Sequence, residues 1–230
     1  AFLQDGHGEG RGRERHRQRT DQRRLPGPAH QQTDGKQQRG AQQHLQRTAA
    51  EHRAAGDRIL VLGTGGVSIW ALQIAKHMGA SVAVTSSSGE KLERARALGA
   101  DFTVNYREQE QWGRQVHDWA DGGVDHVIEV GGPATLAQSI DAVRIGGHIG
   151  LIGVLTGVSG QVPTAALMAK QARLQGLIVG SRRMQQEFVR ALDTSDIRPV
   201  IDRRFPLEGL VDAFRHQESG SHFGKIAVTW

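Results

Sequence analysis

The distribution of apolar residues divides the chain near residue 56. Residues 1–50 contain only four residues of the set Val, Ile, Leu, Met, Phe, Trp and Tyr, namely Phe2, Leu3, Leu25 and Leu45. A segment so poor in apolar side chains cannot bury enough surface to offset the entropy of ordering it. We therefore expect a low-complexity, disordered Gln/Arg-rich segment over residues 1–55 and one folded domain over residues 56–230.

From residue 58 onward, short apolar runs alternate with stretches of helical period. The run 58–62 is rich in strand formers and ends in a glycine cluster, after which Val67, Trp70, Ala71, Ile74, Ala75 and Met78 fall on one face of a helix that Gly79 would end. Further strands are expected at 81–85, 102–105, 124–130, 147–154 and 174–179, and further helices at 89–98, 108–120, 134–143 and 163–172. This alternation is typical of an α/β fold with a Rossmann-type, doubly wound, parallel six-stranded sheet.

The alternation breaks after residue 180. Helices are expected at 184–192 and 207–217, and strands at 200–205 and 225–229. Because these two strands do not continue the regular alternation of strands and helices, we expect them to pair with something other than the main sheet.

The net charge is concentrated in the apolar-poor segment. Residues 1–50 hold ten Lys and Arg against five Asp and Glu, which accounts for the whole formal charge of +5. Clustered arginines can neutralise nucleic-acid phosphates, but this segment has no interleaved aromatic residues and no known binding motif, which favours a solvated tail or an out-of-frame sequence. We therefore do not expect nucleic acid as the partner. A non-catalytic nucleotide-binding module whose basic tail contacts nucleic acid or another partner stays open as the alternative.

The residue inventory excludes several kinds of chemistry. The chain contains no Cys, so it has no disulfides, no cysteine nucleophile and no thiolate zinc site. The histidines after residue 50 show no close metal spacing, and no metal site is expected. No apolar run approaches the roughly 20 residues that span a bilayer, and the N-terminus lacks the apolar core of a signal peptide. We expect a cytoplasmic protein without membrane contact.

The glycine cluster carries the first functional signal. Gly63-Thr64-Gly65-Gly66-Val67-Ser68 lies directly after a strand and directly before a helix, the setting of a dinucleotide-binding turn. Gly63 permits the tight turn, and Gly65 lets the backbone approach a pyrophosphate, which meets the free N–H groups and positive dipole of the helix N-terminus. Ser68 replaces the third glycine and is still small enough for close helix packing.

The end of the second strand indicates which dinucleotide is bound. An NAD site usually carries Asp or Glu there, to accept from the ribose 2′-hydroxyl. This chain has Ser86 there, followed by Ser87 and Ser88, with Lys91 one turn into the next helix. Hydroxyls and an ammonium suit a 2′-phosphate that a carboxylate would repel, so NADP(H) is favoured over NAD(H). The alternative is that the serines only cap the helix that starts near Gly89.

Residues 56–230 resemble the cofactor-binding and C-terminal part of the medium-chain dehydrogenase/reductase superfamily, close to its zinc-type alcohol dehydrogenases and quinone oxidoreductases. The resemblance is carried by the segments 61–68, 90–92, 98–101, 105–107, 127–132, 146–147 and 222–226. It implies that the glycine turn holds the pyrophosphate, through Gly63, Thr64, Gly65, Gly66 and Val67. The ends of the second and third strands would bind the adenosine ribose and its 2′-phosphate, through Ser86, Ser87, Lys91 and Tyr106. Two later loops would line the rest of the cofactor path with Val130, Gly131, Ile152 and Gly153, and Lys225 would approach the cofactor phosphates. Tyr106 has an alternative reading as a half-exposed residue after a strand.

The resemblance also implies an activity and shows what is missing. Superfamily members transfer hydride between a nicotinamide and an alcohol, carbonyl or enone carbon, which makes a small-molecule alcohol, carbonyl or quinone the expected substrate. Their N-terminal catalytic domain is not recognisable in residues 1–55, so the catalytic residues stay unassigned, no zinc is expected in this chain, and the chain would be inactive alone. The C-terminal tail would pack on that catalytic domain, and the edge of the sixth strand, 174–179, would form a homodimer.

Overall fold

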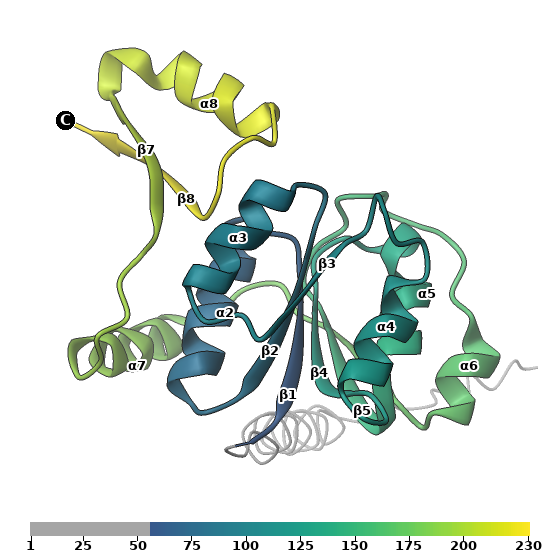
Figure 1. Ribbon diagram of the computed structural model, residues 1–230. Coiled ribbons are helices and arrows are strands. Elements are labelled where there is room, and N and C mark those ends of the chain that lie inside the picture. Colours follow the sequence, from purple (N-terminus) through teal and green to yellow (C-terminus); the bar gives the residue numbers. More distant parts are fainter. Residues whose placement is uncertain (1–55) are drawn as a thin grey trace, which may run out of the picture. The chain divides into compact units, whose positions relative to one another are not determined.

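A parallel six-stranded sheet forms the centre of the computed structural model, which describes residues 56–230 (Figure 1). The expectations for residues 1–55 lie outside the described part. The strands follow the order β3-β2-β1-β4-β5-β6, so the chain winds outward from β1 in both directions, and the doubly wound Rossmann-type fold is confirmed. Their bounds are β1 Arg58–Leu62, β2 Ser81–Ser86, β3 Phe102–Asn105, β4 Val124–Glu129, β5 Val143–Leu151 and β6 Arg173–Gly176.

Helices cover both faces of this sheet, as Figure 1 shows. One core cluster joins α2 (Gly66–His77) and α3 (Gly89–Ala97) to the sheet, and it includes Ile59 and Val61 of β1. The other joins α4 (Trp112–Trp119) and α5 (Pro133–Ala142), with α6 (Thr164–Ala169) packed against it, and it includes Leu60 and Leu62. Neighbouring residues of β1 belong to different clusters because successive strand side chains point to opposite faces.

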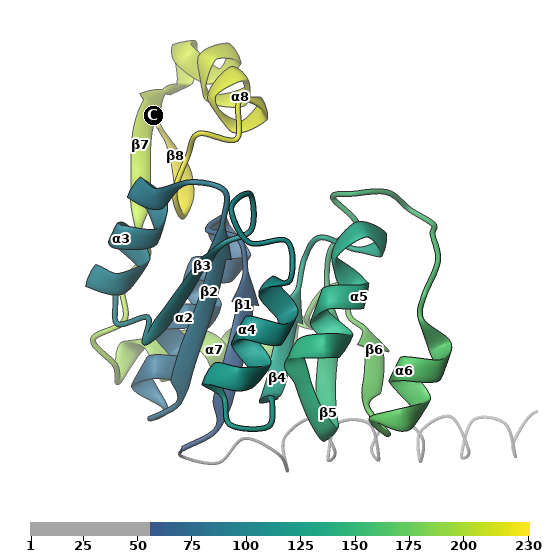
Figure 2. The ribbon, with the colours of Figure 1, turned by 45° about the vertical axis from the view of Figure 1, so that its right-hand side comes forward.

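The C-terminal part forms a separate two-stranded parallel sheet, visible in Figure 2. Its elements are α7 Arg182–Asp193, β7 Ile201–Pro206, the short 3-10 helix Leu207–Gly209, α8 Leu210–Glu218 and β8 Lys225–Thr229. β7 pairs with β8, which confirms that these strands pair outside the main sheet. Phe223, just before β8, is 1% exposed and belongs to the core cluster of α2 and α3. The guanidinium of Arg94 lies 4.2 Å from the centre of its ring.

Several element ends differ from the sequence expectation. The helix expected over 108–120 begins at Trp112, because the amides of Glu108 and Gln109 both donate to the Asn105 carbonyl and close a turn first. The sixth strand covers 173–176 instead of 174–179. The fifth strand runs from 143 to 151 instead of from 147 to 154, and α6 is shorter at both ends than the expected 163–172.

The packing face of α2 was wrong in the sequence interpretation. The residues buried against the sheet side are Ser68, Ile69, Leu72 and Ala75, whereas Val67 and Met78 of the expected face are 45% and 44% exposed. Apolar residues occur around most of this helix, so its periodicity alone does not choose a face. No helix within 56–230 is long and apolar enough to cross a membrane.

Candidate functional site

The turn between β1 and α2 is tightly fixed to the strand that precedes it. Gly63 has φ of +73°, a left-handed conformation that glycine adopts without steric cost. The Ser68 hydroxyl donates to the Leu62 carbonyl over 2.6 Å and is buried. A serine in the place of the third glycine therefore lets the helix lie close to the strand and also ties the two together.

The N-terminus of α2 is open and faces a cation. Gly65 caps the helix without a side-chain bond, and the first turn contains no acidic residue, although the first N–H groups of a helix have no partner within it. A Cβ added at Gly66 would stand 2.7 Å from the Cδ, Cε and Nζ atoms of Lys225. A lysine beside the positive end of a helix is unfavourable unless an anion lies between them. The geometry therefore fits a phosphate group at this turn.

A backbone contact places Lys225 over the turn. The Gly224 amide donates to the Thr64 carbonyl over 3.0 Å, and Gly65 and Gly224 form an isolated parallel bridge. The C-terminal segment thus crosses the glycine turn directly, and the structure brings Gly66 and Lys225 together.

The ends of β2 and β3 bring Ser86 and Tyr106 together. The Tyr106 amide donates to the Ser86 carbonyl over 3.1 Å, and Tyr106 is 44% exposed. The Ser86 hydroxyl is buried and accepts from the Ser88 amide over 3.3 Å. Helix α3 is capped by Ser88, whose hydroxyl accepts from the Lys91 amide. The capping role therefore belongs to Ser88, and Ser86 and Ser87 are not needed for it.

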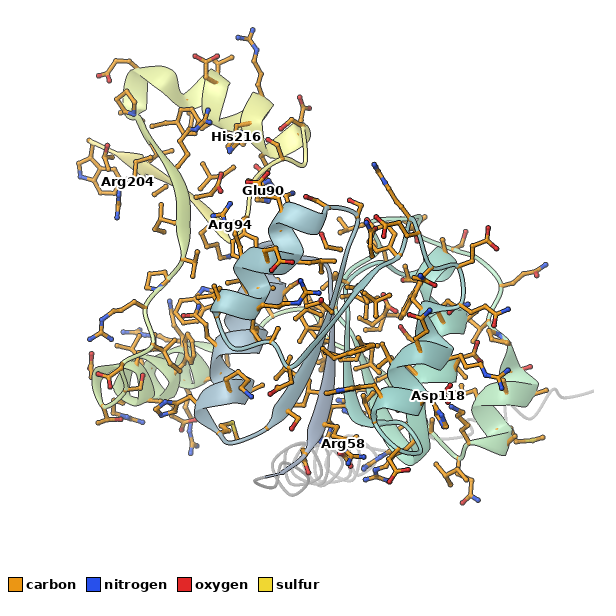
Figure 3. The ribbon with its side chains drawn as sticks, in the orientation of Figure 1. Arg58, Glu90, Arg94, Asp118, Arg204 and His216 are labelled. Carbon is orange, nitrogen blue, oxygen red and sulfur yellow. The ribbon has the colours of Figure 1, made fainter. Side chains whose placement is uncertain are left out.

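The structure does not place the Lys91 ammonium on these serines. Its Nζ donates to the Gly220 carbonyl over 2.6 Å, on the segment that leads to Lys225. Burial lowers the pKa of Lys91, an effect that the charge of Asp202 opposes. Arg94 of α3 and His216 of α8, both labelled in Figure 3, approach Asp202 with contacts of 3.1 Å and 2.9 Å. Helix α3 is thus joined to the C-terminal segment by polar contacts as well as by Phe223.

The two later loops lie side by side at the carboxyl end of the sheet. The amides of Ile152 and Gly153 donate to the Glu129 carbonyl over 2.8 Å and 3.3 Å. A Cβ at Gly153 would stand only 2.3 Å from the Val130 carbonyl oxygen. Sequence reasoning missed Glu129, whose side chain is completely buried. The available signal was a charged residue that ends an apolar strand immediately before Val130 and Gly131.

One cavity joins parts of this arrangement. It has a volume of about 380 Å³, and its lining includes the predicted site residues Gly66, Val67, Ile152 and Lys225. It continues along the exposed apolar face of α2 toward Phe188 of α7, whose ring meets that of Trp70 edge-on at 5.6 Å. Ser86, Tyr106 and Val130 lie outside its lining. The cavity is therefore apolar along α2 and basic at the glycine turn.

No metal centre is formed by the described residues. Within 56–230 no three His, Asp or Glu side chains come together in a way that could hold a metal ion. Three of the histidines instead lie beside aspartates, His117 at 3.5 Å from Asp118, His126 at 3.3 Å from Asp57 and His216 at 2.9 Å from Asp202. The part of the chain that the structure describes offers no set of ligands that fits zinc.

The comparisons with known proteins agree with the fold. The model of the zinc-binding dehydrogenase family matches residues 66–195. The zinc-type alcohol dehydrogenase-like protein C1773.06c of Schizosaccharomyces pombe is 42% identical over 189 residues, which cover 77% of this chain and 53% of that protein. The chain therefore belongs to the zinc-binding dehydrogenase family, within the medium-chain dehydrogenase/reductase superfamily. It spans about half the length of the curated relatives that it matches.

Solved structures show the same partial coverage. A putative alcohol dehydrogenase from Sinorhizobium meliloti 1021 aligns with a TM-score of 0.74 at 43% identity, over 80% of this chain and 54% of that chain. An NAD-dependent alcohol dehydrogenase aligns with a TM-score of 0.73 at 33% identity, over 80% and 54%. The crotonyl-CoA carboxylase/reductase AntE, solved in complex with NADP, aligns with a TM-score of 0.68 at 29% identity, over 77% and 50%.

Proposed function

We propose that residues 56–230 are the dinucleotide-binding domain of an NADP(H)-dependent oxidoreductase of the alcohol dehydrogenase and quinone reductase type. The observation that carries this proposal is the uncapped, acid-free N-terminus of α2 facing Lys225 across the glycine turn. The partial positive charge of the helix N-terminus and the charge of the Lys225 ammonium meet there, and both would stabilise a bound pyrophosphate. The substrate class is an alcohol, a carbonyl compound or a quinone.

The chain's own residues support NADP(H) over NAD(H). Both cofactors occur among the similar structures, so the choice rests on the end of β2. Ser86, Ser87 and Tyr106 lie at this end of the strand, where there is no carboxylate. Lys91 lies in the first turn of the helix that follows. A ribose 2′-phosphate would find hydroxyl donors at this place, whereas an NAD ribose would lack its usual acidic acceptor.

In the bound state, the nicotinamide supplies the hydride or accepts it. The residues of this chain bind and orient: the glycine turn holds the phosphates, Lys225 offsets their charge, and the loops 130–131 and 152–153 line the cofactor path. The apolar wall of the cavity along α2 excludes water from one side of the site. The titratable groups that line the cavity are Asp57, His126 and Lys225, and we assign none of them as the acid or the base.

Fluorescence titration of the purified chain with NADPH and NADH tests this proposal. We expect saturable binding with a preference for NADPH, which Ser86→Asp reverses or abolishes. An aspartate at this position can still accept the Ser88 amide, so the turn is preserved. Lys91→Gln should weaken NADPH but not NADH, with Lys76→Gln as the matched control because Lys76 pairs with Asp101 elsewhere. Absence of binding to both nucleotides would overturn the proposal.

We also propose that the C-terminal tail packs on a catalytic domain like that of the longer relatives. Phe223 and Arg94 attach the tail on one side, while Leu207, Leu210, Val211 and Phe214 are 39% to 61% exposed. An apolar surface of this kind marks an interaction site. The test is the affinity of the chain for the catalytic half of a relative, which Phe214→Lys should lower.

The edge of β6 is the proposed homodimer contact. β6 pairs with β5 on one side only, and Ile178 and Val179, which follow it, are 91% and 88% exposed. An open apolar edge of this kind favours pairing with a second copy. Light scattering should show a dimer that Ile178→Lys converts to a monomer, and a wild-type monomer would refute this arrangement.

A further inference from the structure

The most unusual charged group in the described chain is the side chain of Glu129. It is completely buried, although a buried carboxylate is costly unless it is paired or fully hydrogen-bonded. Within 56–230 no ion pair reaches it, and its partners are uncharged donors instead. Oε1 accepts from the Gly131 amide at 2.7 Å and the Gly132 amide at 3.0 Å, and it lies 2.7 Å from the Thr135 hydroxyl. Oε2 accepts from the Ser139 hydroxyl.

These bonds fix the turn between β4 and α5 in a conformation that few residues tolerate. Gly132, the residue before α5, has φ of 95° and ψ of −140°, a region that is essentially restricted to glycine. A Cβ at Gly131 would stand 2.3 Å from the Thr135 hydroxyl. The glycines therefore allow this backbone conformation, and the carboxylate accepts from the two amides that it directs inward.

A second set of bonds extends this order to the loop that follows β5. The Gly131 carbonyl accepts from the Thr156 amide at 2.8 Å and from the Thr156 hydroxyl at 2.9 Å. The same hydroxyl accepts from the Ala134 amide at 3.0 Å. Glu129 thus holds Gly131, and Gly131 holds Thr156, so that both loops of the proposed cofactor path are anchored by one buried side chain.

We propose that Glu129 is a positioning residue for the cofactor, which acts by holding the loops 130–132 and 152–156 in the conformation that the dinucleotide requires. The inference rests on the proposed function, because it concerns the loops that would line that cofactor. Its physical basis is that hydrogen bonds to a charged acceptor are about twice as strong as neutral ones. The loops are consequently ordered before the ligand arrives, which lowers the entropic cost of binding.

The test is made in the full chain and compares the loss of the bonds from Glu129 to the loop with the loss of its bond to Ser139 in α5. Glu129→Met keeps the volume and removes every acceptor, leaving the Gly131 and Gly132 amides unpaired. Ser139→Ala removes one bond to the same carboxylate from inside α5 and leaves the loop bonds in place. Glu129→Gln is the conservative variant, because its amide oxygen can accept the loop amides while its nitrogen donates to Ser139.

We expect Glu129→Met to raise the Kd for NADPH about tenfold, with faster hydrogen exchange at residues 131–132 and 154–156. Ser139→Ala should leave both unchanged even where it lowers the melting temperature equally, and Glu129→Gln should restore most of the affinity. An unchanged Kd in Glu129→Met, or an equal loss in Ser139→Ala, would overturn the proposal.

Two further outcomes remain decisive. If Glu129→Met does not fold, Thr156→Val tests the same chain of contacts, and an unchanged Kd with unchanged exchange in the two loops refutes it. If the wild-type chain binds no nucleotide, the proposed function fails. The exchange rates of residues 131–132 in Glu129→Met then still show whether Glu129 orders the loop, and rates equal to those of the wild type would refute that role.

Discussion

Two glycine turns lie next to each other at the carboxyl edge of the sheet, and they differ in their electrostatics: one contains a carboxylate and the other does not. β1 and β4 pair in parallel, so the turn before α2 and the turn before α5 are neighbours. Neither α2 nor α5 has an acidic residue in its first turn or a side-chain cap, and the turn before α2 has no carboxylate that takes their place. The turn before α5 already contains an anion, the buried carboxylate of Glu129, which takes two of its amides.

The difference extends to the space around the glycines. A Cβ at Gly65 would meet nothing within 4 Å, whereas one at Gly131 would meet the Thr135 hydroxyl at 2.3 Å. The turn before α2 is thus open and has no negative charge of its own, and we call it the open turn. The turn before α5 is closed, and its amides are paired with a carboxylate of the protein; we call it the closed turn. The same strand, glycine and helix pattern therefore serves two purposes: one turn receives a ligand's anion, and the other is completed by the protein itself.

The comparison predicts that the open turn can be blocked without loss of stability. Gly65 has φ of −79° and ψ of −173°, which any residue adopts, so Gly65→Val should fold normally. Its side chain would occupy the space where a pyrophosphate approaches, and we expect the affinity for NADPH to fall about 100-fold or more. Fluorescence titration measures the affinity, and thermal unfolding measures the stability.

A valine at Gly176 is the matched control for this substitution. Gly176 also has nothing within 4 Å of an added Cβ, but it lies at the end of β6, far along the sheet order from β1. Gly176→Val should leave NADPH binding intact. Equal affinities of the two variants would mean that the turn before α2 does not receive the cofactor.

The contact between the closed turn and the loop that follows β5 should respond in the opposite way. Gly153→Ala forces a Cβ against the Val130 carbonyl, a backbone atom that cannot move aside easily. We expect the free energy of unfolding to fall by about 2 kcal/mol, measured by urea denaturation. Gly150→Ala is the control, because its nearest neighbour is the flexible tip of Leu177 at 3.3 Å. A smaller loss in Gly153→Ala than in Gly150→Ala would contradict the closed character of the turn.

The sequence predicted the strand of the open turn well, for a physical reason. Central strands of a parallel sheet are buried on both faces and read as continuous apolar runs, and the run 58–62, of which four residues are buried, coincides with β1. The packing face of α2 was not predictable in this way, because both Leu72, which is buried, and Trp70, which lines the cavity, are apolar.

The contacts that complete the two turns depend on residues distant in sequence or on backbone direction. Lys225 reaches Gly66 only because the tail crosses the glycine turn at Gly224, and the prediction of its role came from the family resemblance. Glu129 takes its role from two backbone amides that turn back toward it. Local sequence patterns do not record the direction of those amides, so the position of Glu129 at the end of an apolar strand was a signal, but its role could not be derived from the sequence.

Removing the charge of Lys225 tests how much its ammonium contributes to NADPH binding at the open turn. Lys225→Met keeps most of the aliphatic side chain over Gly66 and removes the ammonium. We expect the Kd for NADPH to rise about tenfold, the value of one charge-assisted hydrogen bond. The melting temperature should not fall, since a cation near the helix N-terminus is removed. Lys76→Met, at a surface pair with Asp101, should leave the Kd unchanged, and an equal effect of both would indicate a general charge effect.

The smallest expected effect concerns the segment that carries Lys225 across the turn. Burial lowers the pKa of His222, and the nearby charges of Lys91 and His216 lower it further, while Asp202 opposes them. The folded state therefore binds a proton at this group more weakly than the unfolded chain does, and stability is lost as the pH falls below the ordinary value of 6.5.

Asp202 acts in the same direction at lower pH. Burial alone would raise the pKa of its carboxyl, but hydrogen bonds from His216, Arg94 and the Phe223 amide outweigh burial and lower it. Its contribution to stability is thus present at neutral pH and is lost only as the pH falls below about 4, the range of an ordinary aspartate. A titration that ends at pH 5 therefore isolates the histidine from this carboxyl.

We expect the free energy of unfolding to fall between pH 7 and pH 5, and His222→Asn to reduce that fall by less than about 1 kcal/mol. Urea denaturation at both pH values gives the difference between the wild-type chain and the variant. His77→Asn is the control, because His77 lies in the last turn of α2, away from Lys91 and Asp202. If His222→Asn leaves the pH dependence as steep as in the wild type, protonation of His222 does not loosen the segment. The position of Lys225 over the open turn would then be independent of pH in this range.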